Sequence, residues 1–130
     1  MGGRDILSIG AVKGFEIGDG MAVAQAFGSD NNDAFYMTPE GTPAKRTNHS
    51  GGVLGGISDG SDLIFRAAFK PTPSIALPQQ TVRLSDGAPV TLELRGRHDP
   101  CIVPRAVPCV EAAAAVAVLD AALEAGIWNL

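Results

Sequence analysis

The sequence is poor in aromatic and charged residues, in cysteine and in long apolar runs. Aromatic residues make up 5% of its 130 residues, charged residues make up 18%, and there are two cysteines. The longest uncharged apolar run, over residues 112–119, is about half as long as a membrane span, so we expect no transmembrane helix. The amino-terminal residues are not followed by the apolar segment of a signal peptide. These absences favour a cytoplasmic protein with reduced thiols.

The charge and the cysteine spacing exclude further classes. The net charge of −4 disfavours non-specific binding to nucleic acid. Cys101 and Cys109 lack the spacing of zinc ligands, so no metal site is expected. Hydrophobic residues make up 45% of the chain, which is too apolar for a disordered tail. The length predicts a single domain over 1–130 with one real core.

Glycine and proline are plentiful. The 16 glycines and 9 prolines together make up about 19% of the 130 residues, whereas the usual combined share is about 12%. Many backbone positions therefore need special geometry. Periodicity and turn residues predict an α+β fold, with antiparallel hairpins and helices on one face. The last helix is apolar nearly all round and should pack on several sides. The predicted elements are a strand over 9–17, a short helix over 21–27 capped by Asp19, a long loop over 29–48, a hairpin of 53–58 with 63–69 that turns at Asp59–Gly60, a hairpin of 80–84 with 90–94 around Asp86–Gly87, and a helix over 104–125 with Pro108 in its first turn and Gly126 at its end.

The densest glycine feature is the run that contains Gly51, Gly52, Gly55 and Gly56. It suits a backbone that approaches a flat or anionic ligand, and it equally suits a twisted, bulged hairpin. The run is neither a dinucleotide-binding fingerprint nor a P-loop, because no helix opens after it and no Gly-Lys-Ser/Thr follows. Both interpretations stay open at this point.

The segment Lys70-Pro71-Thr72-Pro73-Ser74 combines a cation, two hydroxyls and a stiff backbone. This set suits a phosphate, because the cation and hydroxyls bind its oxygens and the prolines lower the entropy of fixing the loop. The alternative is a proline-rich strand exit with a solvated lysine.

The run Arg97-His98-Asp99-Pro100 places a guanidinium, an imidazole and a carboxylate side by side. If the segment is a strand, Arg97 and Asp99 share a face. They then form either a plain salt bridge or a site where the arginine binds an anion and the aspartate handles a proton. His49 and His98 each also suit a surface or hydrogen-bonded histidine.

Taken together, these segments resemble the chorismate synthase family. Five motifs follow one another in the family's order and spacing, from about Ser8 to the last helix. The motifs are Ser8–Gly18 with VKGFEIG, Asn48–Gly60 with NHSGGVLGGISDG, Lys70–Ser74 with KPTPS, Arg97–Cys101 with RHDPC, and Arg105–Pro108 with RAVP, followed by Glu111 and Ala112.

The resemblance implies an activity, a cofactor and an architecture. Chorismate synthases are lyases of aromatic amino acid biosynthesis that convert 5-enolpyruvylshikimate 3-phosphate to chorismate and phosphate. The reaction is a 1,4-anti elimination that needs reduced FMN without net redox change. The family fold is a β-α-β sandwich with antiparallel sheets, usually assembled as a tetramer.

The resemblance also implies roles for residues of this chain. The position matching Asp99 lies beside the flavin and assists deprotonation at its N5, so Asp99 is the expected catalytic residue. Gly55 would let the backbone reach the flavin, and Arg97 would stabilise negative charge. The expected FMN contacts are Gly10, Ala11, Gly55, Lys70, Pro71, Thr72, Pro73, Ser74 and Arg97.

The chain departs from the family pattern in two respects. Many members carry Asn or Pro where this chain has Gly10, which removes any side-chain contact there. The resemblance also begins where the last third of the family's chains begins. The family's two catalytic histidines and its phosphate-binding arginines belong to the preceding part, and neither His49 nor His98 replaces those histidines. We therefore expect negligible turnover by this chain alone.

Three hypotheses follow from these departures. The chain is a carboxy-terminal piece of chorismate synthase that holds half a flavin site, a non-catalytic flavin-binding or nucleotide-binding remnant, or an assembly module. The assembly module would pair with an amino-terminal partner or with itself. Because the family fold interleaves its two halves, we expect a homo-oligomer, an amino-terminal complementing partner or a large exposed apolar patch.

Overall fold

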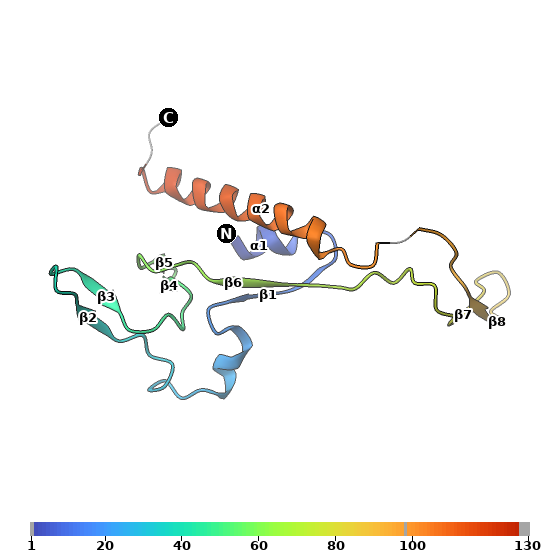
Figure 1. The fold of residues 1–130 in the computed structure, drawn as a ribbon, viewed down its shortest axis with the longest axis horizontal. Helices are drawn as coiled ribbons and strands as arrows, with labels where there is room; N and C mark the ends of the chain where they lie inside the picture. The colour runs from blue at the N-terminus through green and yellow to red at the C-terminus, as the bar shows by residue number, and fades with distance from the viewer. Residues whose placement is uncertain (1, 98, 128–130) are drawn as a thin grey trace.

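The computed structural model describes residues 2–97 and 99–127. Figure 1 shows an elongated molecule in which α2 and α1 lie along one side of a two-stranded ladder, β1–β6, and smaller hairpins extend from both ends of that ladder. The elements are α1 (Gly2–Leu7), β1 (Val12–Ile17), the 3₁₀ helix η1 (Gly20–Gln25), β2 (Phe35–Met37), β3 (Pro43–Lys45), β4 (Val53–Leu54), β5 (Ile57–Ser58), β6 (Phe65–Phe69), β7 (Gln79–Val82), β8 (Pro89–Leu92) and α2 (Val103–Glu124).

The central ladder pairs two segments that are distant in the sequence. β1 and β6 run antiparallel, with Ile17 opposite Phe65 and Val12 opposite Phe69. The register shifts between Val12 and Gly14, as expected for a bulge beside a glycine. The rings of Phe15 and Phe65 stack with their centroids 5.6 Å apart. The strand expected over 9–17 is therefore confirmed for its last six residues.

The expected hairpin of 53–58 with 63–69 is wrong. β4 pairs instead with β5, and Gly55–Gly56 forms the turn between them. Both glycines have positive φ, +60° and +83°, which is the backbone geometry of a tight two-residue hairpin turn. The Asp59–Gly60 turn lies beyond this small hairpin, and β6 is thereby left free to pair with β1.

Two further predictions needed correction near the glycine-rich amino-terminal half. The long loop expected over 29–48 contains the antiparallel pair β2–β3. The short helix expected over 21–27 is the 3₁₀ helix η1, and Asp19 makes no side-chain capping bond to it. The Asp19 carboxylate instead lies 2.7 Å from Nδ1 of His49, so the interpretation of His49 as a hydrogen-bonded histidine is confirmed.

The elements with local turn signals were predicted well. β7 and β8 form the expected hairpin around Asp86–Gly87. The helix expected over 104–125 is α2, and it ends in a Schellman motif. The amide of Gly126, at φ +67°, donates to Leu123, and the amide of Ile127 donates to Ala122.

Pro108 was expected in the first turn of the last helix, but the structure places it inside α2. Pro104 occupies the first turn instead. Because Pro108 has no N–H, one backbone hydrogen bond is missing from the second turn of the helix.

The buried core is smaller than the chain length predicts. Among the described residues, the buried apolar side chains are Ile6 of α1, Val12 of β1 and Ala106 of α2. They lie where α1, β1 and α2 meet. A hollow of about 280 Å³ remains between β6 and α2, lined by apolar side chains of both elements. The small hairpins extend away from the central ladder (Figure 1), and few of the described side chains are buried.

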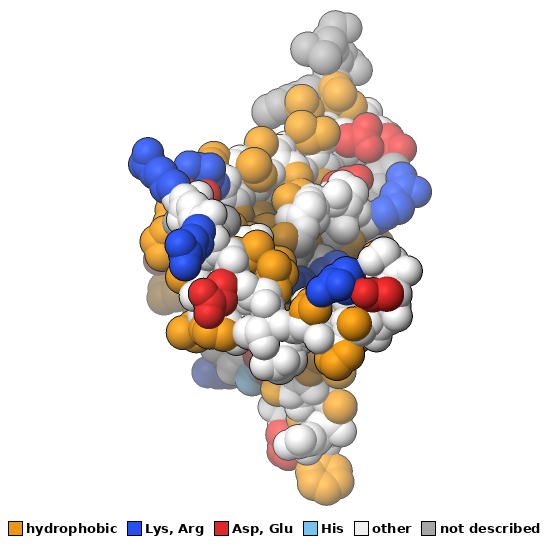
Figure 2. Space-filling model, turned by 90° about the vertical axis from the view of Figure 1, so that its right-hand side faces the viewer, with side chains coloured by type: hydrophobic (Ala, Val, Ile, Leu, Met, Phe, Trp, Pro, Cys, Tyr) orange, Lys and Arg blue, Asp and Glu red, His pale blue; other side chains and the backbone are white. Residues whose placement is uncertain are grey.

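Large apolar side chains are exposed over several elements. On α2, Val116 is 66% exposed, and on β2, Met37 is 65% exposed. The end of the molecule seen in Figure 2 carries hydrophobic side chains interspersed among charged ones. Large apolar side chains are thus exposed in the described part of the chain, and the expected large apolar patch or oligomer stays a prediction.

α2 as a whole is more apolar than expected from its longest uncharged run, residues 112–119. An 18-residue window of this helix has a mean hydropathy of 1.8, so α2 is long and apolar enough to cross a membrane by length and composition alone. Core helices of soluble proteins pass the same test, and only 6% of this window is buried here. A helix this apolar is expected to pack against other apolar surfaces.

Candidate functional site

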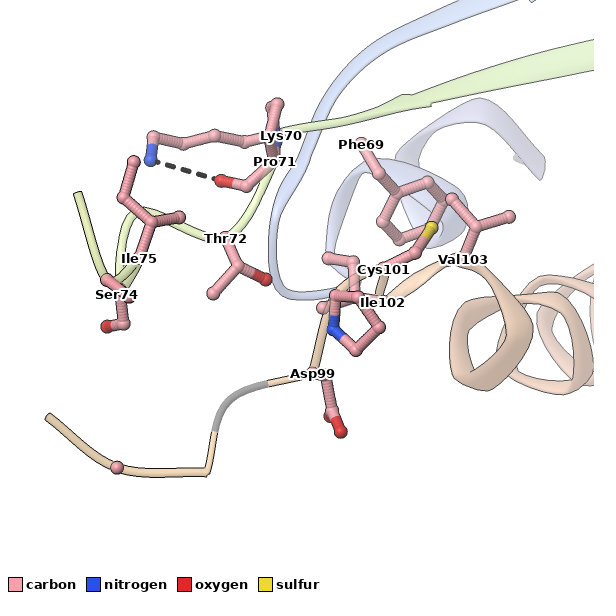
Figure 3. A pocket seen from close by; sticks show the side chains of 13 residues that line it. Phe69, Lys70, Pro71, Thr72, Ser74, Ile75, Asp99, Cys101, Ile102 and Val103 are labelled. Atoms are coloured by element: carbon pink, nitrogen blue, oxygen red, sulfur yellow. Dashed lines mark hydrogen bonds between the residues drawn. The ribbon is translucent and has the colours of Figure 1, made fainter.

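A second hollow lies where β6 ends and α2 begins. It measures about 550 Å³ and is open to solvent (Figure 3). One wall is the segment after β6 and the other is the segment that leads into α2. The lining residues are Phe69, Lys70, Pro71, Thr72, Ser74, Ile75, Ala76, Gly96, Asp99, Pro100, Cys101, Ile102 and Val103. Two separate motifs of the sequence, KPTPS and RHDPC, therefore face one cavity.

The KPTPS segment follows β6 because proline ends the ladder. The amide of Lys70 donates the last hydrogen bond, 2.8 Å long, to the carbonyl of Ala11. Pro71 has no amide to continue the pairing, and the chain leaves the sheet at that point. This bond also brings the Gly10–Ala11 turn beside Lys70. Three predicted cofactor contacts thus lie together at one end of the ladder.

Ala11 holds an unusual backbone conformation in this turn. Its φ is +69°, which L-residues other than glycine and asparagine rarely adopt and which costs roughly 1–2 kcal/mol. The amide of Val12 closes the turn by donating to Ile9 over 3.2 Å. In this conformation the carbonyl of Ala11 accepts the hydrogen bond from the amide of Lys70.

Thr72 has a buried hydroxyl without a partner. Its Oγ1 is enclosed and makes no hydrogen bond to any described residue. An unpaired buried hydroxyl costs about 1–3 kcal/mol, so such a group suggests a ligand that would pair with it. The Lys70 side chain of the same segment extends away from the Thr72 hydroxyl, and its ammonium makes a 3.5 Å contact with the carbonyl of Pro71 (Figure 3). Both groups are therefore available to a ligand.

Asp99 lies at the rim of the cavity and pairs with an arginine. Its Oδ2 is 3.0 Å from Nη1 of Arg105, in the first turn of α2. In Figure 3 the Asp99 carboxylate points away from Thr72. The expectation of an Arg97–Asp99 pair in a strand is wrong, since this segment is irregular and the partner of Asp99 is Arg105. Sequence reasoning missed that pair, because no rule of spacing links a loop residue to a helix that starts after it.

The remaining predicted contacts lie elsewhere. Of the described residues, Arg97 is exposed and does not line the cavity. Gly55 lies in the β4–β5 turn, which precedes β6, whereas Lys70 follows it (Figure 1). Pro73 is next to the cavity, where its carbonyl accepts a 3.2 Å hydrogen bond from Gln79. His98 lies outside the described residues.

The walls other than Lys70 and Asp99 are mostly apolar. Ile75, Ile102 and Val103 supply aliphatic surface, and sequence reasoning did not find these three. Cys101 also lines the cavity, and both cysteines are free and exposed. Apolar walls with a few polar groups suit a ligand that is flat and apolar in one part and polar in another.

A second group of polar side chains is buried beside the glycine run. We call it the Lys45 cluster, and it consists of Asp33, Lys45, Ser50 and Asp59. Nζ of Lys45 lies 3.1 Å from Asp33, 2.6 Å from Asp59 and 2.9 Å from Oγ of Ser50. The Lys45 side chain is 3% exposed and that of Asp33 is 4% exposed. Sequence reasoning missed this cluster, whose members come from four separate segments.

Hydrogen bonds shift the pKa values of Asp33, Lys45 and Asp59. Burial raises the pKa of Asp33, but bonds from the Ser50 amide, the Ser50 and Thr47 hydroxyls and the His49 amide outweigh it and hold this pKa well below its usual range. The hydrogen bond with Asp59 raises the pKa of Lys45, although burial opposes it. The same hydrogen bond lowers the pKa of Asp59.

These shifts predict a loss of stability in acid. Both carboxylates have lower pKa values in the folded chain than the roughly 3.9 of an unfolded aspartate, so the unfolded chain takes up protons first as the pH falls. The free energy of unfolding should be full above about pH 5 and decline through about pH 3. Urea unfolding followed by circular dichroism across this range measures it.

The control for the acid experiment is a second acidic residue. Asp33→Asn should flatten the pH dependence, and Asp120→Asn, at an exposed position of α2, should leave it parallel to that of the unchanged chain. A urea midpoint that stays constant from about pH 7 to about pH 3 would contradict the role of the buried carboxylates.

Comparison with known proteins gives one family. The family model described as chorismate synthase matches residues 3–123. The chorismate synthase of Agathobacter rectalis is 63% identical over 120 residues, which are 92% of this chain and 32% of that protein. The chorismate synthase of Methanothermobacter thermautotrophicus is 51% identical over 123 residues, 95% of this chain and 33% of that protein. The chain thus spans about a third of the length of the relatives it matches.

A solved structure is also similar. The crystal structure of a chorismate synthase superposes on this chain with a TM-score of 0.50 and 37% sequence identity. The match covers 52% of this chain and 20% of that chain. This similarity confirms the α+β class expected from the sequence.

Proposed function

The chain belongs to the chorismate synthase family, and we propose that it supplies the part of a chorismate synthase site that contacts reduced FMN. The observation that carries the proposal is the cavity between the KPTPS and RHDPC segments. In the proposed reaction, phosphate leaves 5-enolpyruvylshikimate 3-phosphate by 1,4-anti elimination and chorismate remains. The proposed compartment is the cytoplasm.

The residues around the cavity fit an FMN. The Thr72 hydroxyl, which has no partner among the described residues, and the Lys70 ammonium offer a donor and a cation to phosphate or flavin oxygens. Ser74 adds a second hydroxyl. Aliphatic side chains from both walls offer a surface on which a flat ring can lie. A flavin ligand would therefore satisfy both the polar and the apolar groups of this cavity.

The individual roles that we propose follow from chemistry and position. Pro71 and Pro73 restrict the loop, so less entropy is lost when it binds a ligand. The Gly10–Ala11 turn, tied to Lys70, presents backbone to the same ligand. Reduced FMN, when bound, supplies an electron-rich ring to the elimination and shows no net redox change. Asp99 accepts a proton at its carboxylate, and Arg105 holds that carboxylate by the 3.0 Å ion pair.

Two proposed contacts lie outside the cavity wall. Arg97 is exposed two residues before Asp99 and would stabilise negative charge on the flavin or the substrate. Gly55 would let backbone approach the ligand from the β4–β5 turn, where a Cβ would meet no described atom within 4 Å.

A second candidate function is a non-catalytic flavin-binding or assembly module of this family. The exposed apolar side chains of α2 favour it, because a helix of this composition needs a covering surface. The proposed partner is a second copy of the chain or an amino-terminal segment of the family. Turnover by an enzyme that contains this chain distinguishes the two candidates, because a non-catalytic module would not support it.

Anaerobic titration with reduced FMN tests the flavin site. The chain should bind FMN saturably, and Lys70→Gln should raise the Kd at least about tenfold, since a charge-assisted hydrogen bond is worth about 1.5–3 kcal/mol. Thr72→Val should also raise the Kd while leaving the stability of the ligand-free chain equal or higher, because the deleted hydroxyl bonds to none of the residues that the structure describes.

The matched control is Arg83→Gln, which removes one positive charge from the β7–β8 turn, where Arg83 pairs with Asp86. Its Kd for FMN should equal that of the unchanged chain. Absence of saturable binding would overturn the proposed flavin site. An equal loss of affinity in Arg83→Gln and Lys70→Gln would reduce the role of Lys70 to bulk charge.

A further inference from the structure

We propose that Lys45 is a positioning residue, whose ammonium holds the β4–β5 hairpin and the Gly55 turn at its tip by joining the base of that hairpin to the rest of the chain. The importance of this position for FMN rests on the proposed function. The hold itself is a property of the Lys45 cluster, and it can be tested without any ligand.

The cluster gathers segments that the sheet does not connect. Asp33 precedes β2, Lys45 ends β3, Ser50 lies in the turn before β4, and Asp59 directly follows β5. β4 and β5 form a sheet of their own, separate from β2–β3 and from β1–β6. Side-chain bonds to Lys45 therefore connect hairpins that share no backbone ladder.

One side of the cluster fixes the turn that leads into the hairpin. The Asp33 carboxylate accepts hydrogen bonds from the Thr47 hydroxyl over 2.7 Å, from the His49 amide over 2.8 Å and from the Ser50 amide over 3.0 Å. The Ser50 hydroxyl adds a fourth bond of 2.7 Å. A carboxylate with this many donors, charged and buried, holds residues 47–50 in one conformation.

The other side closes the base of the hairpin. The amide of Asp59 donates to the carbonyl of Gly52 over 3.2 Å, across the ends of β4 and β5. The Asp59 carboxylate accepts from the Ser61 amide with one oxygen and from Lys45 with the other. Lys45 thus binds the β4–β5 hairpin at its base, through the residue that directly follows β5.

The tip of the hairpin has no comparable support. A Cβ placed on Gly55 or Gly56 would meet no described atom within 4 Å. Its direction is therefore set at the base, by Lys45 and by the close packing of Gly51 and Gly52. Without the ammonium, Asp33 and Asp59 would lose their shared cation in a buried site, which is strongly unfavourable.

Amide hydrogen exchange on the full chain tests this proposal. In Lys45→Met, the amides of Ser50 and Asp59 should exchange at least about tenfold faster, because the base of the hairpin opens locally. The amide of Lys70, bonded to Ala11 in the central ladder, should exchange within about twofold of the unchanged chain. A merely structural contribution would accelerate all of these amides together.

The control is Lys13→Met, which makes the same change at an exposed lysine of β1. It should leave the Ser50 and Asp59 amides unchanged. If Lys45→Met does not fold, Asp59→Asn provides the second test, because it keeps the Asp33 carboxylate beside the lysine. In this variant only the backbone amide of residue 59 should exchange faster. Uniform acceleration, or none, in the variant that folds would overturn the proposal.

A parallel titration with reduced FMN separates this inference from the proposed function. If the unchanged chain binds FMN, Lys45→Met should raise the Kd, and Lys13→Met should not. If the unchanged chain binds no FMN, the proposed function fails, while the exchange pattern still decides the role of Lys45. An unaltered Kd with a locally opened hairpin would confine Lys45 to holding the hairpin and would overturn its importance for FMN.

Discussion

Gly51→Ala is expected to unfold the chain, whereas Gly60→Ala should leave it folded. Gly51 has a φ of +66°, and a Cβ there would lie 2.7 Å from both Cα of Gly18 and the carbonyl oxygen of Ile64. Both of these atoms belong to backbone and cannot rotate away. The substitution must therefore separate the chain segments themselves.

The segments that would separate hold the end of the central ladder. The amide of Gly18 donates to Ile64 over 2.9 Å, and the amide of Ile64 donates to Gly51 over 3.1 Å. The amide of Asp19 donates to His49 over 2.9 Å. Losing these bonds together, in a chain with few buried side chains, should cost more than about 4 kcal/mol.

Gly60 is the matched control because only its surroundings differ. Its φ is +86°, but a Cβ there would meet no described atom within 4 Å. Gly60→Ala should therefore cost about 1–2 kcal/mol, for the left-handed backbone alone. Thermal and urea unfolding, followed by circular dichroism, measure both variants. Similar midpoints for the two would contradict the close packing at Gly51.

The sequence predicted elements that depend on neighbouring residues better than pairings between residues far apart in the chain. The β7–β8 hairpin was predictable because Asp86 and Gly87 encode their own turn, and the end of α2 was predictable from Gly126. The β1–β6 pairing was not, since β1 and β6 lie far apart in sequence and a glycine-rich segment between them offered a nearer partner. Local patterns contain no information that chooses between those partners.

The same distinction applies to the candidate site. Lys70 and Asp99 came from motifs, and the structure brings them to one cavity. Two features of the site depend on how separate segments meet, and the sequence could not predict them. They are the Thr72 hydroxyl, which has no partner among the described residues, and the ion pair of Asp99 with Arg105. Of the two interpretations of the glycine run, the hairpin is confirmed at Gly55–Gly56, and the approach to a ligand stays a prediction. Gly51 is needed for close packing within the chain, whereas a Cβ on Gly55 would meet no described atom within 4 Å.

Asp99→Asn should have the largest effect on turnover in an enzyme that contains this chain. The proposed role of Asp99 is to accept a proton, and an amide cannot do so. General acid–base groups contribute about 10²- to 10⁴-fold to rate, so kcat should fall by about that factor while FMN binding changes little. The control is Asp120→Asn, which removes a carboxylate from an exposed position on α2 and should keep full turnover.

A hybrid enzyme provides the setting for this variant. The chain matches 32% of the Agathobacter rectalis chorismate synthase at 63% identity, so the 120 aligned residues can replace the matching third of that protein. At this identity the hybrid should fold with the same contacts. It supplies every group of the relative that lies outside the matched third.

The most direct measurement is the release of phosphate from 5-enolpyruvylshikimate 3-phosphate by this hybrid with reduced FMN. If the chain supplies the flavin-contacting part of the site, the hybrid should form chorismate within about tenfold of the rate of the relative, and Asp99→Asn should lower that rate at least about a hundredfold. A folded hybrid that binds FMN but releases no phosphate, or one whose Asp99→Asn variant keeps its full rate, would contradict the proposed function.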